Sequence, residues 1–177
     1  MRFLLFTYLL IVPCVTMAAE KAFVPTPPGE AEIKVLPAGR LLESRSSGSY
    51  FDRSNNLFGP LFRYISQNGI SMTSPVEARI DPGVMYFWVS ESQVDKTVGD
   101  REGVRVVDIP QRTVAAMGFR GGYSEDNYEK AKISLMEWIE EKGYLRPQGE
   151  PFAVYWDGPM TPWFMKSFEV MVEVEVR

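Results

Sequence analysis

The sequence predicts an α+β fold made of two strand-helix-strand-strand units, whose strands form a distorted antiparallel β-barrel with two helices packed on it. Two helical stripes, one ending near residue 69 and the other near residue 143, are each flanked by extended runs. The same order of turns and runs occurs in both halves, which indicates an internal repeat. A chain of 177 residues is long enough for one domain with its own core.

The first half opens with a predicted strand at residues 32–36, a turn at 37–39 and a second extended run at 40–46. A helix follows and ends at Asn68-Gly69, and its apolar face consists of Phe58, Leu61, Phe62 and Ile65. Pro60 is expected in or just before the first turn of this helix, where a missing amide hydrogen costs least. Two strands, at 73–80 and 84–90, should flank a turn at Asp81-Pro82-Gly83.

The second half repeats this order with extended runs at 104–109 and 113–119, separated by Pro110. Asp126, with Glu129 three residues on, is the expected helix start, and Gly143 is the expected stop. The apolar stripe between them is Tyr128, Ala131, Leu135, Trp138 and Ile139. Strands are predicted at 152–156 and 167–174, and in the last of them glutamates alternate with apolar residues, which indicates an acidic outer face.

The N-terminus has the layout of a secretory signal peptide, residues 1–19. Met1-Arg2 precede an apolar stretch at 3–12, which is too short to span a bilayer, and small residues follow at Ala18 and Ala19. We therefore expect an exported, periplasmic or extracellular protein with no stable membrane insertion after cleavage. Lipidation of Cys14 is the alternative, although Pro13 fits a lipidation motif badly. Residues 20–29 are proline-rich and predict an extended linker, so the domain should occupy 30–177.

Composition excludes several functional classes. A net charge of -4 without a lysine and arginine run gives no basis for binding nucleic acid. The chain has no histidine, and its only cysteine is Cys14, so imidazole-based triads and His/Cys zinc sites are excluded. Carboxylate chemistry remains open. Glu77 and Asp81 are possible acid-base residues, but we interpret them as solvated surface charges.

Three separated motifs resemble the SOUL heme-binding family. Tyr64-Ile65, Asn68-Gly69 and the segment Ile70-Ser71-Met72-Thr73-Ser74-Pro75-Val76 resemble the family's helix end and following segment. Ile109 to Ala115, with Phe119-Arg120-Gly121-Gly122, resembles the opening of its second half. Tyr155 to Pro159, Thr161-Pro162 and Phe168-Glu169-Val170 resemble its closing motif. The resemblance runs from about Glu30 to Val176.

This resemblance implies a duplicated distorted barrel, related to bacterial effector-binding domains, that binds heme or another tetrapyrrole. Some members are assigned an axial histidine, which this chain cannot supply. Two modes remain, namely apolar contacts with cationic side chains near the propionates, or iron ligation by methionine or tyrosine.

Seven residues are candidates for such a site, and each also has an ordinary structural interpretation. Met72, just after the first helix, is a possible iron ligand or a core-filling residue, and Tyr64 is a possible phenolate ligand. Arg63 could pair with a propionate or be solvated. The other four, as apolar wall or pocket rim, are Phe58, Phe62, Met160 and Trp163.

The leading functional hypothesis is a non-enzymatic binder of heme or a related tetrapyrrole. The alternatives are a binding module for another small apolar effector, and a carboxylate-only hydrolase acting on a tetrapyrrole or an ester.

Overall fold

A computed structural model describes residues 19–158 and 160–177. The predicted signal peptide, which includes Cys14, lies outside these described residues except for its last residue, Ala19. The strands of the first half are Ala31–Leu36 (β1), Gly39–Arg45 (β2), Val76–Arg79 (β3) and Val84–Val89 (β4), with helix Tyr50–Gln67 (α1). A short 3-10 helix, Glu91–Lys96 (η1), follows. The second half has strands Arg105–Ile109 (β5), Arg112–Arg120 (β6), Leu145–Tyr155 (β7) and Ser167–Val176 (β8), with helix Glu125–Lys142 (α2).

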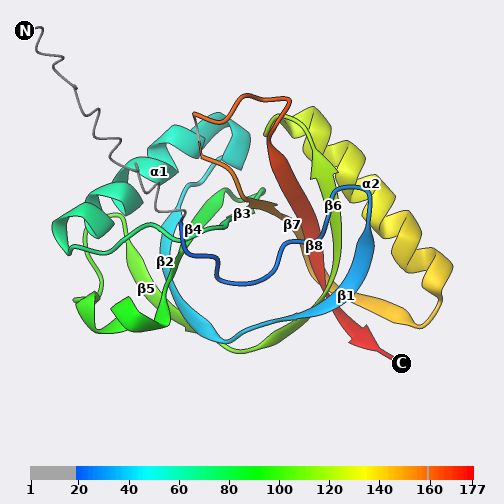
Figure 1. The fold of residues 1–177 in the computed structure, drawn as a ribbon, viewed down its shortest axis with the longest axis horizontal. Coiled ribbons are helices and arrows are strands. Elements are labelled where there is room, and N and C mark those ends of the chain that lie inside the picture. The colour runs from blue at the N-terminus through cyan, green and yellow to red at the C-terminus, as the bar shows by residue number, and fades with distance from the viewer. Residues whose placement is uncertain (1–18, 159) are drawn as a thin grey trace, which may run out of the picture.

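The eight strands form one antiparallel sheet in the order β1-β6-β8-β7-β3-β4-β2-β5. This order is symmetric about the β7-β3 pair, and each half lends its first strand to the sheet edge of the other half. The predicted α+β class and the repeat are therefore confirmed. The barrel prediction needs correction, because β1 and β5 are edge strands that do not pair with each other. The sheet is strongly curved but open (Figure 1).

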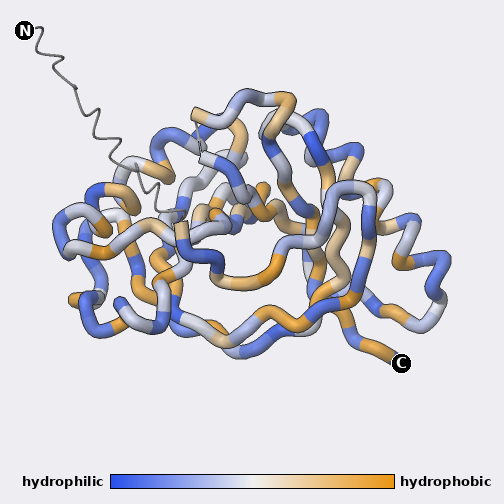
Figure 2. The backbone as a smooth tube through the Cα atoms, in the orientation of Figure 1, coloured by the Kyte–Doolittle hydropathy of each residue, from blue (hydrophilic) through white to orange (hydrophobic). Residues whose placement is uncertain are grey.

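The two helices pack on the same face of the sheet, which we call the helix face, with α1 against β2 and β4 and α2 against β6, β7 and β8, so that they lie on opposite sides of the molecule (Figure 1). The main core lies between them and the sheet, with Leu42, Leu61, Leu135 and Val172 among its fully buried side chains. The opposite face lines the inside of the curve, and we call it the inner face. Figure 2 shows hydrophilic and hydrophobic residues alternating along the strands, as expected when neighbouring side chains point to opposite faces.

Both helices end where predicted but begin earlier. α1 begins at Tyr50, so Pro60 lies inside the helix, where it leaves the carbonyl of the exposed Asn56 without its usual donor. α2 begins at Glu125, and the Ser124 hydroxyl, not Asp126, caps it by accepting a hydrogen bond from the Asn127 amide. Gly143 ends α2 in a left-handed conformation, as expected. Among the described helices, none is long and apolar enough to cross a membrane.

The acidic outer face predicted for β8 is wrong for its first half, where Glu169 and Met171 are buried, whereas Glu173 is half-buried and Glu175 is exposed as expected. Glu169 is fully buried on the inner face, where its carboxylate accepts hydrogen bonds from the Lys34 ammonium (2.6 Å) and the Trp156 indole (2.7 Å). The prediction failed because the curved sheet encloses its second face, so an alternating polar residue need not face water. Glu77 differs from its prediction for the same reason, since it is buried, whereas Asp81 is exposed as expected.

Residues 20–29, expected as a linker, run extended across the inner face and form what we call the strap (Figure 1). The Thr26 amide donates to the Glu169 carboxylate (3.0 Å), and the Gly29 amide donates to the Gly118 carbonyl (2.9 Å). Phe23 contacts Trp88 and Trp156 edge to face, with ring centroids 5.6 and 5.2 Å away. The proline-rich segment is therefore extended, as predicted, but it packs as part of the folded structure.

Candidate functional site

An apolar cleft of about 500 Å³ opens on the helix face between α1 and the ends of β7 and β8. α1 supplies one wall, β3, β4 and the segment before β3 supply the floor, and the second half supplies the other wall. The residues that line the cleft are mostly aromatic or sulfur-containing: Tyr50, Phe51, Ser54, Asn55, Phe58, Met72, Val76, Met85, Tyr123, Tyr155, Asp157, Gly158 and Lys166. Its volume and composition are those of a small-molecule site.

Tyrosine rings form the deep part of the cleft. Tyr155 stacks on Tyr50 (5.8 Å between centroids) and lies against Tyr123 (4.3 Å). The Tyr155 hydroxyl is buried and has no hydrogen-bond partner among the described residues. Burial raises the pKa of Tyr155 well above its usual value, so the group is a neutral phenol. A buried hydroxyl without a partner is costly, and a ligand's polar atom could satisfy it.

Tyr123 also fixes the base of the loop that joins β7 to β8. Its hydroxyl accepts a hydrogen bond from the Asp157 amide (2.8 Å) and donates to the Ser167 carbonyl (2.9 Å). The Asp157 carboxylate accepts hydrogen bonds from the Ser167 amide (2.7 Å) and hydroxyl (3.0 Å). The two ends of the loop are therefore held together beside the cleft.

Lys166 is the only cationic residue that lines the cleft, among the residues that the structure describes. Its ammonium lies over the Tyr123 ring, 4.8 Å from the centroid. It takes part in none of the ion pairs found within residues 19–158 and 160–177. The edge of the cleft thus offers one positive charge to an acidic ligand group, beside the Asp157 carboxylate, which also lines the cleft but accepts hydrogen bonds from Ser167.

The structure brings two of the seven predicted site residues into this cleft, Phe58 and Met72. Met72 is half-buried and packs against the core beside the cleft. Phe62 stacks on Phe58 with centroids 5.6 Å apart but is itself half exposed outside the lining. Met160 and Trp163 belong to the same β7-β8 loop, yet their side chains are exposed and do not line the cleft.

Arg63 and Tyr64 lie outside the cleft. Arg63 is exposed on α1. Tyr64 is buried, and its hydroxyl donates to the Gly99 carbonyl (3.0 Å) and accepts from the Val98 amide (3.0 Å). That hydroxyl is committed to positioning the segment after η1 and is not available to a ligand in the cleft.

Sequence reasoning missed Tyr50, Tyr123, Tyr155 and Lys166. A signal was present for two of them, since Tyr155 begins the closing motif and Tyr123 directly follows the Gly121-Gly122 pair. No local pattern joins Tyr123, Tyr155 and Lys166 to α1, because they reach it only through the pairing of β7 with β3 and β8.

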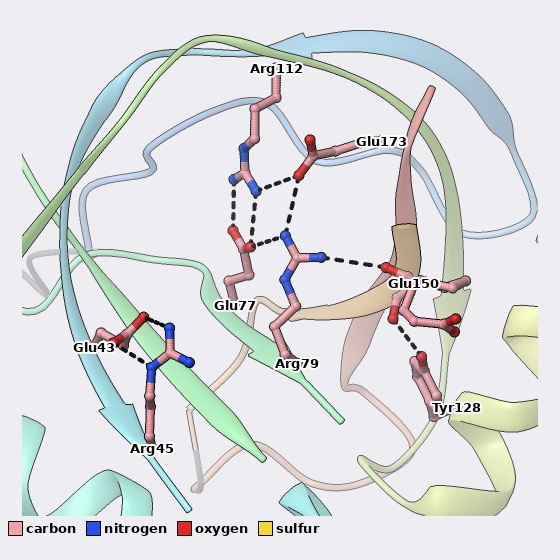
Figure 3. A network of polar contacts seen from close by, with 9 residues as sticks. Glu43, Arg45, Glu77, Arg79, Arg112, Tyr128, Glu150 and Glu173 are labelled. Carbon is pink, nitrogen blue, oxygen red and sulfur yellow. Dashed lines mark hydrogen bonds and ion pairs between the residues drawn. The ribbon is translucent and has the colours of Figure 1, made fainter. Parts of the chain in front are cut away.

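The inner face carries a network of ion pairs around the buried Glu77 and Arg112 (Figure 3). The Arg112 guanidinium donates two hydrogen bonds to the Glu77 carboxylate (3.2 and 2.9 Å). Glu173 lies 3.3 Å from Arg79 and 3.5 Å from Arg112, and both guanidinium groups lie over the Phe152 ring. Since Glu77 and Arg112 are on strands β3 and β6, which are not neighbours, the network bridges the concavity of the sheet.

Glu43, also on the inner face, is held by arginine. The Arg45 guanidinium donates two hydrogen bonds to it, each 2.7 Å long. Burial raises the pKa of the Glu43 carboxyl, but the hydrogen bonds from Arg45 and Tyr86 and the charges of Arg45 and Arg105 outweigh burial and lower it overall. A general acid needs the opposite shift, so Glu43 does not favour the carboxylate-hydrolase alternative. In the described part of the chain, no three His, Cys, Asp or Glu side chains group as a metal site.

Solved structures similar to this chain share its fold at low sequence identity. The C-terminal domain of EcmrR matches with a TM-score of 0.66 and 18% identity over 84% of this chain and 98% of that domain. In the complex of EcmrR with DNA, the match spans 58% of the longer chain. Two Listeria innocua proteins follow, an uncharacterized conserved protein (TM-score 0.61, 12% identity, 84% of this chain and 94% of that one) and a hydrolase (0.56, 13%, 85% and 94%).

No curated protein sequence matches the chain. The family model described as SOUL heme-binding protein matches residues 22–173, which include most of the strap and every helix and strand except the last residues of β8. This match confirms the family that the three sequence motifs indicated. The chain belongs to the SOUL heme-binding protein family.

Proposed function

We propose that this protein binds heme or a related tetrapyrrole in the cleft between α1 and the ends of β7 and β8. The observation that carries the proposal is the lining of that cleft, which is aromatic in its depth and has one unpaired cation, Lys166, at its edge. A tetrapyrrole has the complementary chemistry, because its broad apolar ring carries carboxylates on one side. Membership of a heme-binding family supports the same ligand class.

The residues of the cleft fit such a ligand without histidine. Phe58, Tyr50 and Tyr155 would contact the ring, and Lys166 would pair with a propionate. Met72 is the predicted iron ligand that lies in the cleft, and its thioether would hold the iron of a bound heme. The Tyr155 hydroxyl can donate a hydrogen bond to a polar atom of the ligand. Bound heme would supply a redox-active iron in an apolar environment.

Binding without catalysis, and export, are parts of the same proposal. The ion pairs that hold Glu43 and Glu77 favour a structural use of the inner-face carboxylates. The signal-like residues 1–19 favour export, and N-terminal sequencing of the protein from culture fractions should find a start near Glu20. A protein that keeps its first residues in the cytoplasm would refute the export proposal.

The test is a hemin titration of the chain from Ala19 to Arg177, followed by Soret absorbance. We expect saturable binding by the parent. Lys166→Glu should raise the dissociation constant about tenfold or more, because a charge-assisted pair is lost. The same variant should bind hemin dimethyl ester as the parent does, because the ester has no carboxylate to pair. Lys130→Glu, on the exposed side of α2, is the matched control.

Two further variants test the wall and the iron ligand. Phe58→Ala should weaken binding of hemin and of metal-free protoporphyrin alike. Met72→Ala should change the Soret position if the thioether coordinates iron, whereas Met136→Ala, a half-buried methionine on α2, should not. Absence of saturable binding, or binding insensitive to Phe58, Met72 and Lys166 variants together, would refute the proposed site.

A further inference from the structure

The loop between β7 and β8 presents a cluster of large apolar side chains to solvent. Met160 is 94% exposed, Trp163 71%, Phe164 61% and Met165 57%. The other exposed large apolar side chains in the described residues are spread over the strap, β1, both helices, the segments that follow η1 and α2, and the chain end. Scattered apolar residues are ordinary on protein surfaces, but four within six residues mark an interaction site. We call Met160, Trp163, Phe164 and Met165 the loop cluster.

The loop holds this cluster outward by its own hydrogen bonds. The Thr161 amide donates to the Gly158 carbonyl (3.2 Å), and the Met165 amide donates to the Pro162 carbonyl (2.9 Å). Trp163 and Phe164 contact each other edge to face with centroids 5.8 Å apart. Because Tyr123 and Asp157 also fix the base of the loop, the exposure belongs to a braced conformation, and little conformational entropy would be lost when a partner covers the cluster.

We propose that the loop cluster inserts into the interface of a lipid bilayer, so that the protein docks on a membrane with its cleft facing the lipid. Tryptophan is enriched at membrane interfaces, and phenylalanine and methionine gain from leaving water there. The loop, residues 156–166, contains one acidic side chain, Asp157, whose carboxylate accepts hydrogen bonds from Ser167 at the base of the loop. Two cations, Lys166 within the loop and Arg120 opposite Ser167 in the sheet, are in no ion pair within the described residues, so they can meet lipid phosphates.

The place of the cluster favours a bilayer over a protein partner, and this step rests on the proposed function. Gly158 and Lys166, at the two ends of the loop, both line the cleft, so insertion of the loop would bring the cleft mouth to the headgroup region. Tetrapyrroles are planar, largely apolar molecules that partition into bilayers. A cleft that opens at the membrane surface can receive such a ligand without its passage through water.

Apolar insertion, not charge, should dominate the affinity. Glu125 and Asp126 begin α2 just after Gly122, whose backbone lies near the Trp163 side chain, and they oppose any strong attraction to anionic lipid. We therefore expect binding to zwitterionic phosphatidylcholine vesicles, with only a modest increase when phosphatidylglycerol is added. A purely electrostatic surface would bind only the anionic vesicles.

The test is sedimentation of the chain from Ala19 to Arg177 with vesicles of phosphatidylcholine alone and with 30% phosphatidylglycerol, about one lipid in three. The partition coefficient of the double variant W163A/F164A should be about tenfold or more lower than that of the parent, because two aromatic side chains that would move from water into the bilayer are absent. The matched control is I133A/Y144A, which removes two exposed apolar side chains from the middle of α2 and from the turn after it, both outside the β7-β8 loop. It should bind vesicles as the parent does.

Three results would overturn the proposal: no binding to either vesicle, equal loss in the two double variants, or self-association that W163A/F164A abolishes while vesicle binding is absent. The last result would assign the loop cluster to a protein contact. A hemin titration of W163A/F164A in lipid-free buffer separates this proposal from the proposed function, because the cluster does not line the cleft and hemin affinity there should be unchanged.

Discussion

Removal of the buried Glu77 carboxylate should lower the free energy of unfolding strongly. Its side chain is 2% exposed and that of Arg112 is 9% exposed, and two hydrogen bonds join the two groups across the inner face. Glu77→Ala would leave Arg112 buried with only Glu173, 3.5 Å away, as a carboxylate partner. Breaking a buried pair in this way costs about 3–5 kcal/mol. For a domain of this size, that free energy corresponds to a decrease of about 6–20 °C in Tm.

Urea unfolding of the chain from Ala19 onward, followed by tryptophan fluorescence and far-UV circular dichroism, measures the free energy of unfolding. The double variant E77L/R112M should recover most of the loss, because it removes both charges and fills the space with apolar groups. Asp108→Ala, which breaks the exposed pair with Arg40, should change the midpoint far less. A loss below about 1 kcal/mol for Glu77→Ala, or a double variant as unstable as the two single variants added together, would refute the reasoning.

Three more predictions concern the strap and two titrating groups. A methyl group at Gly118 would lie 2.4 Å from the carbonyl oxygens of Thr26 and Pro27, so Gly118→Ala should detach the strap and speed amide exchange in residues 20–29, whereas Gly59→Ala, which meets open space, should not. Burial, and then the charge of Glu43, raises the pKa of Tyr86 to about 12. An unfolded tyrosine titrates near pH 10, so the stability conferred by neutral Tyr86 is lost as the pH rises from 10 to 12. The free energy of unfolding of Tyr86→Phe should therefore decrease less steeply than that of the parent in this range, by up to about 1.4 kcal/mol per pH unit. The pKa of Glu43 is lowered, so its contribution is present above about pH 4.3 and lost below it, and Glu43→Gln should flatten the acid limb of the stability profile.

The elements of secondary structure could be predicted because their signals are local. The helix stops at Asn68-Gly69 and Gly143, the breaks at Pro37 and Pro110, and the alternation in β8 all lie within a few residues of what they determine. The start of α1 was missed because Pro60 is a strong local sign of a first turn, yet a proline inside a long helix is tolerated where the residue that loses its hydrogen-bond donor, here Asn56, is exposed. The start of β7 was missed because Pro147 and Gly149 resemble a turn, although the segment pairs with the end of β8.

The inner face could not be predicted, because its burial is a property of the whole sheet. Glu77 and Glu169 each alternate with apolar neighbours, which is the pattern of a solvent-facing position on an ordinary sheet. Here the curvature brings β3 opposite β6, and the strap covers what remains, so both carboxylates are enclosed. The partners that make their burial tolerable, Arg112 and Lys34, are 35 and 135 residues away in the sequence.

The duplication also explains why a single ligand site is expected. Two hollows lie at equivalent places in the duplicated fold, one between the start of α1 and the ends of β7 and β8, the other between the start of α2 and the ends of β3 and β4. Beside α1 the hollow is the aromatic cleft, whereas beside α2 it is lined by charged groups that include Arg45, Arg79, Glu125 and Glu129. The connection between β3 and β4 is only four residues long, while the one between β7 and β8 carries the loop cluster. The two hollows have therefore diverged in lining and in rim, and hemin should bind with a stoichiometry of one per chain at the aromatic cleft. A second equivalent bound with similar affinity would mean that the inner face or the charged hollow also accepts the ring.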